Sequence, residues 1–314
     1  HRDEKDDDKL IGFFIVLAAG LIIVSCGNKT ESGKNDLKNA SFSKNQDKET
    51  LVASVPPLKW VVQKIAGKEY NVISVIQPNM NHELFEPKTD DLVRLEKSKL
   101  FFTYDALNFE EKITSAINDK NKVLNVLNGI DPHLFLEDHD DDEHGGHHHD
   151  EHEHNGKFDP HVWFSLEMMP KVAENIKNKL VETYPNQKDK FEKNYNDFIK
   201  ELDGFKKEIS EKMSKKTKKH FMIYHPALEY FLKGTGIEEE AIESEGKEPS
   251  AKQIQEIISE AKEDGISTIL VQPQFPKQSI DIIAKEIPNA KIVTFNTDEE
   301  DVFENLRKFV DSLQ

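Results

Sequence analysis

NQKDKFEKNYNDFIKELDGFKKEISEKMSK, residues 186–215, has the periodicity of a long amphipathic helix. Apolar residues recur three or four positions apart along it, at Phe191, Tyr195, Phe198, Leu202, Phe205 and Ile209. Pro185 separates this stretch from a shorter helical pattern, because proline interrupts helical hydrogen bonding. At 1.5 Å per residue, a helix over 186–215 is about 45 Å long. A helix of that length can bridge two lobes, so we interpret 165–217 as linking helices.

On both sides of the linking helices, short apolar stretches alternate with helical ones. Before them, strands are predicted at 51–55, 71–76, 99–104 and 122–127, with helices at 89–97 and 109–117. After them, strands are predicted at 220–225, 267–272 and 291–295, with helices at 226–233, 251–263, 277–286 and 299–313. This alternation indicates parallel strands covered by helices. The predicted fold class is α/β, with one (β/α) lobe over 50–164 and a second over 218–314.

The N-terminal region reads as an export signal. Residues 10–24, LIGFFIVLAAGLIIV, are short for a membrane-spanning helix and typical of a signal-peptide core. They lead into IVSCG at 23–27, which resembles a lipobox. We therefore predict a lipoprotein signal peptide over 1–25, a lipid anchor at Cys26 and a flexible tether over 26–49, in an extracytoplasmic, membrane-anchored protein. The acidic flank HRDEKDDDK departs from the usual positive charge, and a short anchor helix is the alternative.

Composition excludes several function classes. The formal charge is −17, from 42 basic and 59 acidic residues, and no stripe of Lys and Arg with interleaved aromatic residues occurs. Nucleic-acid binding is therefore not expected. The single cysteine excludes an intramolecular disulfide and a cysteine-based zinc finger.

Three histidines lie in well-formed local contexts: His82 in PNMNHELFEP, His161 in FDPHVWFS and His225 in MIYHPALEYF. His82 and His225 follow predicted strands, and loops at the carboxyl ends of parallel strands converge on ligand-binding crevices. Imidazole is a common ligand of first-row metals. We predict a metal site of three imidazoles with an open fourth position, buried between the lobes. His133 and His220 lack such contexts and are interpreted as structural.

Residues 138–154, DHDDDEHGGHHHDEHEH, form an acidic, histidine-rich segment of low complexity. Its histidines are candidate ligands of an auxiliary, weaker metal-binding loop: His139, His144, His147, His148, His149, His152 and His154. Two other interpretations stay open. The segment can be a merely solvated acidic insertion, or 147–152 can be a variant of the metallo-hydrolase pattern HxHxDH, although no strand precedes it.

Several motifs occur in a specific order: HELFEP at 82–87 with Asp90, DPHVW at 159–163, YHPALEYF at 224–231, EGKEPS at 245–250 and VQPQF at 271–275. With them, the chain resembles the zinc/manganese class of metal-binding solute-binding lipoproteins of ABC transporters, over about 51–314. The resemblance implies two lobes, a rigid backbone helix and a metal in the interlobe cleft. It also implies that His82, His161 and His225 are the histidine ligands.

The fourth ligand does not carry over cleanly. Members of the family often place an aspartate after the last strand, where this chain has Asn296, with Asp298 nearby. Manganese-type members use a glutamate of the second lobe, for which Glu243 and Glu245 are candidates. Three histidines with few carboxylates, together with the acidic histidine-rich loop, favour Zn²⁺ over Mn²⁺. Ligating imidazoles usually donate their other N–H to an oxygen, and for this role we name Glu83, Asp90 and Asp159.

The functional expectation is a monomeric binding protein that captures Zn²⁺ and delivers it to a membrane permease, with no catalysed reaction. A three-histidine metalloenzyme is the rival from a different class, and it requires a carboxylate base beside the open position. An Mn²⁺-binding protein or a surface adhesin on the same scaffold is a third alternative.

Overall fold

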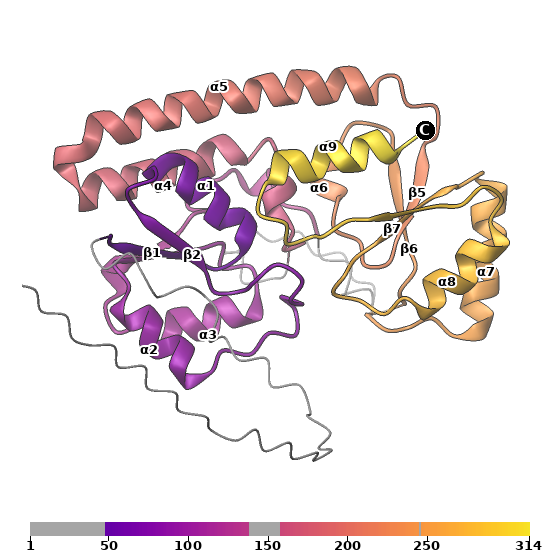
Figure 1. Ribbon diagram of the computed structural model, residues 1–314, viewed down its shortest axis with the longest axis horizontal. Helices are drawn as coiled ribbons and strands as arrows, with labels where there is room; N and C mark the ends of the chain where they lie inside the picture. The colour runs from indigo at the N-terminus through magenta and orange to yellow at the C-terminus, as the bar shows by residue number, and fades with distance from the viewer. Residues whose placement is uncertain (1–47, 138–157, 245) are drawn as a thin grey trace, which may run out of the picture. The chain divides into compact units, whose positions relative to one another are not determined.

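The computed structural model describes residues 48–137, 158–244 and 246–314 (Figure 1). The N-terminal lobe contains β1 (Thr50–Ala53), α1 (Pro56–Ala66), β2 (Asn71–Ser74), α2 (Thr89–Lys97), β3 (Leu100–Thr103), α3 (Asn108–Ala116) and β4 (Val123–Asn125). Its strands are all parallel and form a sheet in the order β2-β1-β3-β4. Two single-turn 3-10 helices, η2 (Lys120–Lys122) and η3 (Pro132–Leu134), flank β4.

The C-terminal lobe has the same architecture. It contains β5 (His220–Ile223), α6 (Glu229–Leu232), β6 (Glu238–Ala241), α7 (Ala251–Glu263), β7 (Thr268–Val271), α8 (Gln278–Glu286), β8 (Lys291–Thr294) and α9 (Val302–Ser312). Its parallel sheet has the order β6-β5-β7-β8, which is the order of the first sheet repeated. The predicted α/β class with two parallel-sheet lobes is confirmed.

Between the lobes lie η5 (Val162–Phe164), α4 (Met169–Thr183), η6 (Pro185–Gln187) and the long helix α5 (Lys188–Met213). The 26 residues of α5 contact α1 and α4 at one end and α9 at the other (Figure 1). The apolar stripe predicted from the sequence is the buried face of this helix, including Phe198 and Phe205. The long helix therefore joins the two lobes, as the sequence predicted.

One hydrophobic core spans both lobes. Phe303 of α9 lies 4.8 Å from Trp60 of α1 and 4.2 Å from Phe205 of α5, measured between ring centroids. Phe198 of α5 stacks on the same ring at 6.1 Å. A smaller core cluster fills the other face of the C-terminal sheet. The aromatic contacts of Phe303 thus fix α9 against elements of the first lobe.

Helices α1 and α6 and strand β6 differ from the sequence prediction. The helix predicted at 226–233 covers only Glu229–Leu232. Helix α1 was not predicted: Pro56 and Pro57 stand at its first two positions, which prolines can occupy because the first helical turn does not use the N–H that proline lacks. Strand β6 was not predicted, since its sequence EEEA has no apolar alternation and its pairing with β5 alone defines it. Among the described residues, no helix has both the length and the apolar character needed to cross a membrane.

The base of the acidic histidine-rich segment is held by backbone contacts. Glu137 and Phe158 form an antiparallel bridge, and the Asp159 N–H donates to the Leu136 carbonyl at 2.9 Å. The Tyr230 hydroxyl of the C-terminal lobe accepts from the Leu136 N–H at 3.2 Å and donates to the Asp159 carbonyl at 2.8 Å. Both ends of the segment therefore meet at one tyrosine of the other lobe.

Candidate metal centre

The three predicted histidines come together where the lobes meet. His82 lies in the loop after β2, His161 directly precedes η5, and His225 follows β5. All three are buried, with 5%, 2% and 7% of their surface exposed. The ring of His161 lies 5.4 Å from that of His82 and 5.3 Å from that of His225, between centroids.

Each histidine has a carboxylate on its Nδ1 atom. His82 Nδ1 lies 2.8 Å from Asp298 Oδ2, His161 Nδ1 lies 2.7 Å from Asp159 Oδ1, and His225 Nδ1 lies 2.7 Å from Glu243 Oε1. An ionised carboxylate can only accept, so each Nδ1 carries the hydrogen. The lone pair of each neutral ring is therefore left on Nε2, which is the arrangement of a metal-ligating imidazole.

The three Nε2 atoms are buried and lack a hydrogen-bond partner within the described parts of the chain. An unpaired buried polar atom is costly, and it usually marks a group that another species satisfies. Three such nitrogens from neighbouring rings provide the donors of a borderline-soft cation such as Zn²⁺. The residues present therefore fit a bound zinc ion.

Glu83 supplies an oxygen on the same side as these nitrogens. Its Oε1 atom lies 3.0 Å from His225 Nε2, without the alignment of a hydrogen bond. Ligand-type atoms of His82, Glu83 and His161 also lie within 4.8 Å of one another. The sequence analysis named Glu83 as an acceptor for the second N–H of a ligating imidazole. In the structure, its carboxylate lies instead on the side of the Nε2 atoms.

The candidates for the fourth ligand from the second lobe lie elsewhere. Asp298 and Glu243 occupy the Nδ1 side of His82 and His225. Asn296 uses its Oδ1 atom to accept the Asp298 N–H at 3.0 Å and its Nδ2 atom to donate to Asn79 at 3.1 Å. Their side chains thus shape the loop and orient the rings. Glu245, Cys26 and the seven histidines of 138–154 lie outside the described residues.

The remaining named residues have structural positions. Asp159 contacts both the ring and the backbone N–H of His161, at 2.7 and 2.9 Å. Asp90 is exposed in the first turn of α2, where a negative charge favours the helix dipole. His133 is exposed on η3, and His220 Nδ1 lies 3.0 Å from Glu240 Oε1 at the start of β5.

Gln272 is a residue of the centre that the sequence analysis did not identify. It is fully buried, its Oε1 accepts the His225 N–H at 2.8 Å, and its Nε2 donates to the His225 carbonyl at 3.0 Å. The same nitrogen lies 2.7 Å from Thr297 Oγ1, and the Thr297 carbonyl accepts from Trp163 Nε1 at 3.1 Å. Gln272 lies in the motif VQPQF, but that motif alone does not indicate that the Gln272 side chain bonds both the N–H and the carbonyl of His225.

The carboxylates shift the pKa values of the centre. Burial lowers the pKa of His82, but Asp298 outweighs burial and the net pKa is raised. Burial likewise opposes a charged His225, yet Glu243 and Glu83 raise its pKa to about 10. For Glu83, burial favours the neutral acid, but the neighbouring His225 lowers the pKa to about 2. Without a cation, the His225 ring thus carries a proton, which supplies the positive charge that a bound metal ion would otherwise supply.

Comparisons with known proteins identify relatives that bind or take up zinc. The family model described as "ZnuA: Zinc-uptake complex component A periplasmic" matches residues 51–314. The high-affinity zinc uptake system protein ZnuA of Bacillus subtilis (strain 168) is 29% identical over 295 residues, covering 92% of this chain and 88% of that protein. Zinc-binding lipoprotein AdcA of Streptococcus pneumoniae is 26% identical over 282 residues. That alignment covers 88% of this chain and 53% of AdcA, so the chain spans about half the length of this relative.

A solved structure has the same fold. A crystal structure of ZnuA superposes with a TM-score of 0.72 at 26% identity, covering 84% of this chain and 97% of that one.

Proposed function

Because the chain belongs to the ZnuA family of periplasmic zinc-uptake components, we propose that it captures Zn²⁺ outside the cytoplasm and delivers it to the permease of an ABC-type importer. The observation that carries this proposal is the convergence of three buried imidazole nitrogens that lack a hydrogen-bond partner among the described residues, with the Glu83 carboxylate 3.0 Å from that of His225. Each has its tautomer set by a carboxylate, so the donors are oriented before the ion arrives.

The proposed ligands are the Nε2 atoms of His82, His161 and His225 and the carboxylate of Glu83. Three nitrogens and one oxygen around a tetrahedral ion suit Zn²⁺, whereas more carboxylates would favour Mn²⁺. Glu83 replaces the earlier candidates for the fourth position, since Asp298 and Glu243 hold the opposite ring nitrogens. Its side chain is 32% exposed, so this ligand lies on the solvent side of the centre and can be the one exchanged first.

Transport, rather than catalysis, accounts for this site. The family is a transport component, so the rival hypothesis of a three-histidine metalloenzyme is not retained. No contact among the described residues favours the alternatives of Mn²⁺ binding or adhesion. We further propose that Cys26 carries a lipid anchor and that the protein acts as a monomer, with the segment 138–154 as an auxiliary, weaker zinc-binding loop.

Alanine substitution of each proposed histidine tests the ligand set. His82→Ala, His161→Ala and His225→Ala should each weaken zinc affinity tenfold or more, because each removes one coordinate bond. Affinity is measured by competition with a chromogenic chelator, using protein first stripped of metal. His133→Ala is the matched control, since His133 is exposed on η3.

Glu83→Gln tests whether the Glu83 carboxylate binds the zinc ion or only lies beside it. It should weaken zinc affinity less than a histidine substitution does, because water can take the fourth position. An unchanged affinity in any histidine variant would remove that residue from the ligand set. Equal effects of His133→Ala and the others would refute the proposed centre.

A further inference from the structure

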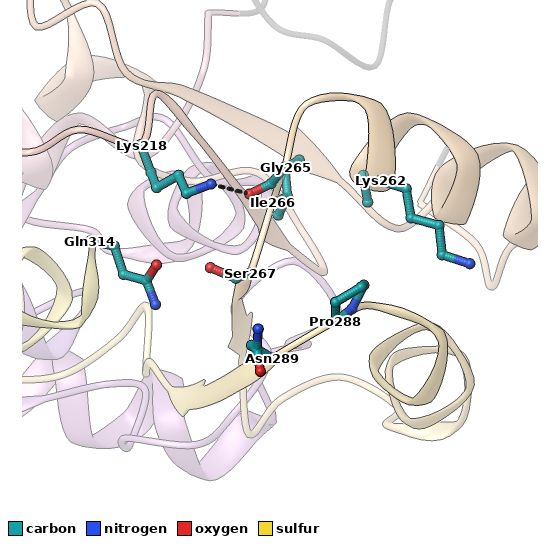
Figure 2. A pocket seen from close by; sticks show the side chains of 9 residues that line it. Lys218, Lys262, Gly265, Ile266, Ser267, Pro288, Asn289 and Gln314 are labelled. Atoms are coloured by element: carbon teal, nitrogen blue, oxygen red, sulfur yellow. Dashed lines mark hydrogen bonds between the residues drawn. The ribbon is translucent and has the colours of Figure 1, made fainter.

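The C-terminal lobe contains a cavity of about 470 Å³ (Figure 2). It lies at the amino-terminal ends of the strands, whereas the metal centre lies at their carboxyl ends. Its lining residues Lys218, Ser267 and Asn289 lie just before β5, β7 and β8. The residues of the metal centre follow the carboxyl ends of these same parallel strands. The cavity is therefore separated from the centre by the length of the sheet.

Ser267 gives this cavity an unsatisfied donor. The residue is only 8% exposed, and its hydroxyl has no hydrogen-bond partner among the residues that the structure describes. In Figure 2 the hydroxyl points into the space beside the side chains of Lys218 and Gln314. A buried hydroxyl left unpaired destabilises a fold, so it indicates a group that another species completes.

Lys218 places a positive charge beside that hydroxyl. Its Nζ atom donates to the Gly265 carbonyl at 3.0 Å (Figure 2). Gly265 has a φ of +64°, and a Cβ atom there would lie 3.1 Å from this Nζ. An ammonium has three donors, so the bond that positions Lys218 leaves others for a ligand.

The lining is suited to an anion although the chain as a whole is acidic. None of the nine described lining residues carries a carboxylate side chain, whereas two are lysines and two, Asn289 and Gln314, carry amides. Lys262 lines the rim, and its ammonium points outward in Figure 2. Five lysines lie between 212 and 219 in a chain whose net charge is −17. Among the described side chains that line the cavity, two carry a positive charge and none a negative one, although Lys262 also lies 4.0 Å from Glu286. This balance favours negatively charged groups.

We propose that this cavity is a second binding site, for a small oxyanion of the phosphate class held by the Lys218 ammonium and the Ser267 hydroxyl. Charge-assisted hydrogen bonds from an ammonium to a phosphate oxygen are short and strong, and the amides of Asn289 and Gln314 complete a polar lining. The same chemistry is presented by free phosphate and by the headgroup of an anionic phospholipid.

Two substitutions in the full-length chain test the site. Ser267→Ala should weaken the binding of inorganic phosphate about tenfold, as expected for the loss of one hydrogen bond to a charged group. It should leave the melting temperature without ligand unchanged or raised, because it removes an unpaired donor. Lys218→Met should weaken phosphate binding by a similar factor. Lys215→Met is the matched control: it removes the same charge from an exposed residue outside the cavity lining.

Binding is measured by calorimetry with inorganic phosphate and by co-sedimentation with vesicles of phosphatidylcholine with or without phosphatidylglycerol. Binding in either assay that depends on Ser267 and Lys218, but not on Lys215, supports the site and identifies its source of phosphate. Failure to bind either probe overturns the proposal. An equal loss in Lys215→Met also overturns it, since a diffuse lysine patch would then suffice. A lowered melting temperature of Ser267→Ala without ligand would mean that the hydroxyl is bonded within the fold, which would overturn its role as a donor to phosphate.

Discussion

The carboxylates of two glutamates flank the ring of His225, one beside each ring nitrogen. Glu243 lies on Nδ1 at 2.7 Å, and Glu83 lies beside Nε2 at 3.0 Å. This arrangement raises the pKa of His225 to about 10, against the opposing effect of burial. In the metal-free protein, the charged ring therefore stabilises the fold fully below pH about 6.5, and this contribution is lost as the pH rises through about 10.

Zinc binding should release protons at neutral pH. The pKa of His225, about 10, means that this ring holds a proton in the metal-free protein, and the ion must displace that proton. Affinity should therefore rise with pH through the neutral range and fall towards pH 5. Calorimetry at about pH 7.5, in buffers with different ionisation enthalpies, counts the protons.

Glu243→Gln is the informative variant for this count. It removes the first of the two charges that raise the pKa of His225, so fewer protons should be released. A proton count of zero in the unsubstituted protein would contradict the derived charge state of the centre.

At the scale of elements, the turn that follows His225 depends on a half-buried glutamate. Glu239 of β6 accepts the Leu228 N–H at 3.1 Å and the Ala227 N–H at 3.3 Å. Burial raises the pKa of this carboxyl to about 7, although the two N–H bonds favour its ionised form. The fold thus favours the protonated acid, and the stability that this group contributes is lost as the pH rises from about 4.5 to about 7.

Glu239→Gln should stabilise the protein at about pH 8 and have little effect at about pH 4.5. The amide oxygen still accepts the backbone N–H bonds, while the cost of a buried charge disappears. Thermal unfolding at the two pH values measures the difference. Glu238→Gln, on the exposed neighbour, should show no such pH-dependent gain. A gain of equal size at both pH values would exclude titration of Glu239 as the cause.

The strands and helices show where sequence reasoning succeeds. Helices α2 and α7 were predicted with their observed bounds, because their apolar periodicity and first-turn residues are local signals. Strand β6 was missed, since an edge strand of glutamates is defined by its partner strand. Likewise, histidine motifs indicated the centre, but Asp298 lies 216 residues from His82, and only tertiary packing brings these two side chains together.

For the whole molecule, the shared core around Phe303 decides how the lobes respond to substitution. Phe303 is 1% exposed and contacts the aromatic rings of α1 and α5. Phe303→Ala should lower the free energy of unfolding by about 3–5 kcal/mol, through lost burial and the cavity left behind.

Urea unfolding followed by fluorescence measures the effect of Phe303→Ala. Leu84→Ala, at a residue that is 79% exposed, is the control and should change stability little. Because α9 and α5 share this core, unfolding should remain one transition in both variants. Two separate transitions in the unsubstituted protein would contradict a common core.

Removing the acidic histidine-rich segment should separate tight from weak zinc binding. The proposed cleft ligands all lie outside 138–154, so its deletion should leave one tight site and a folded protein while lowering total zinc stoichiometry. Calorimetric titration of the deletion variant measures both sites. Loss of the tight site would show that a histidine of the segment supplies a ligand to the centre.

The bridge between Glu137 and Phe158 has a consequence for the segment that it closes. The segment enters and leaves the fold at adjacent backbone positions, which Tyr230 fixes from the other lobe. Doubling the length of a connecting loop adds only about 0.6 kcal/mol of closure entropy. The segment can therefore be lengthened, shortened or given new ligands at little cost to the stability of the fold, while the residues of the centre stay the same.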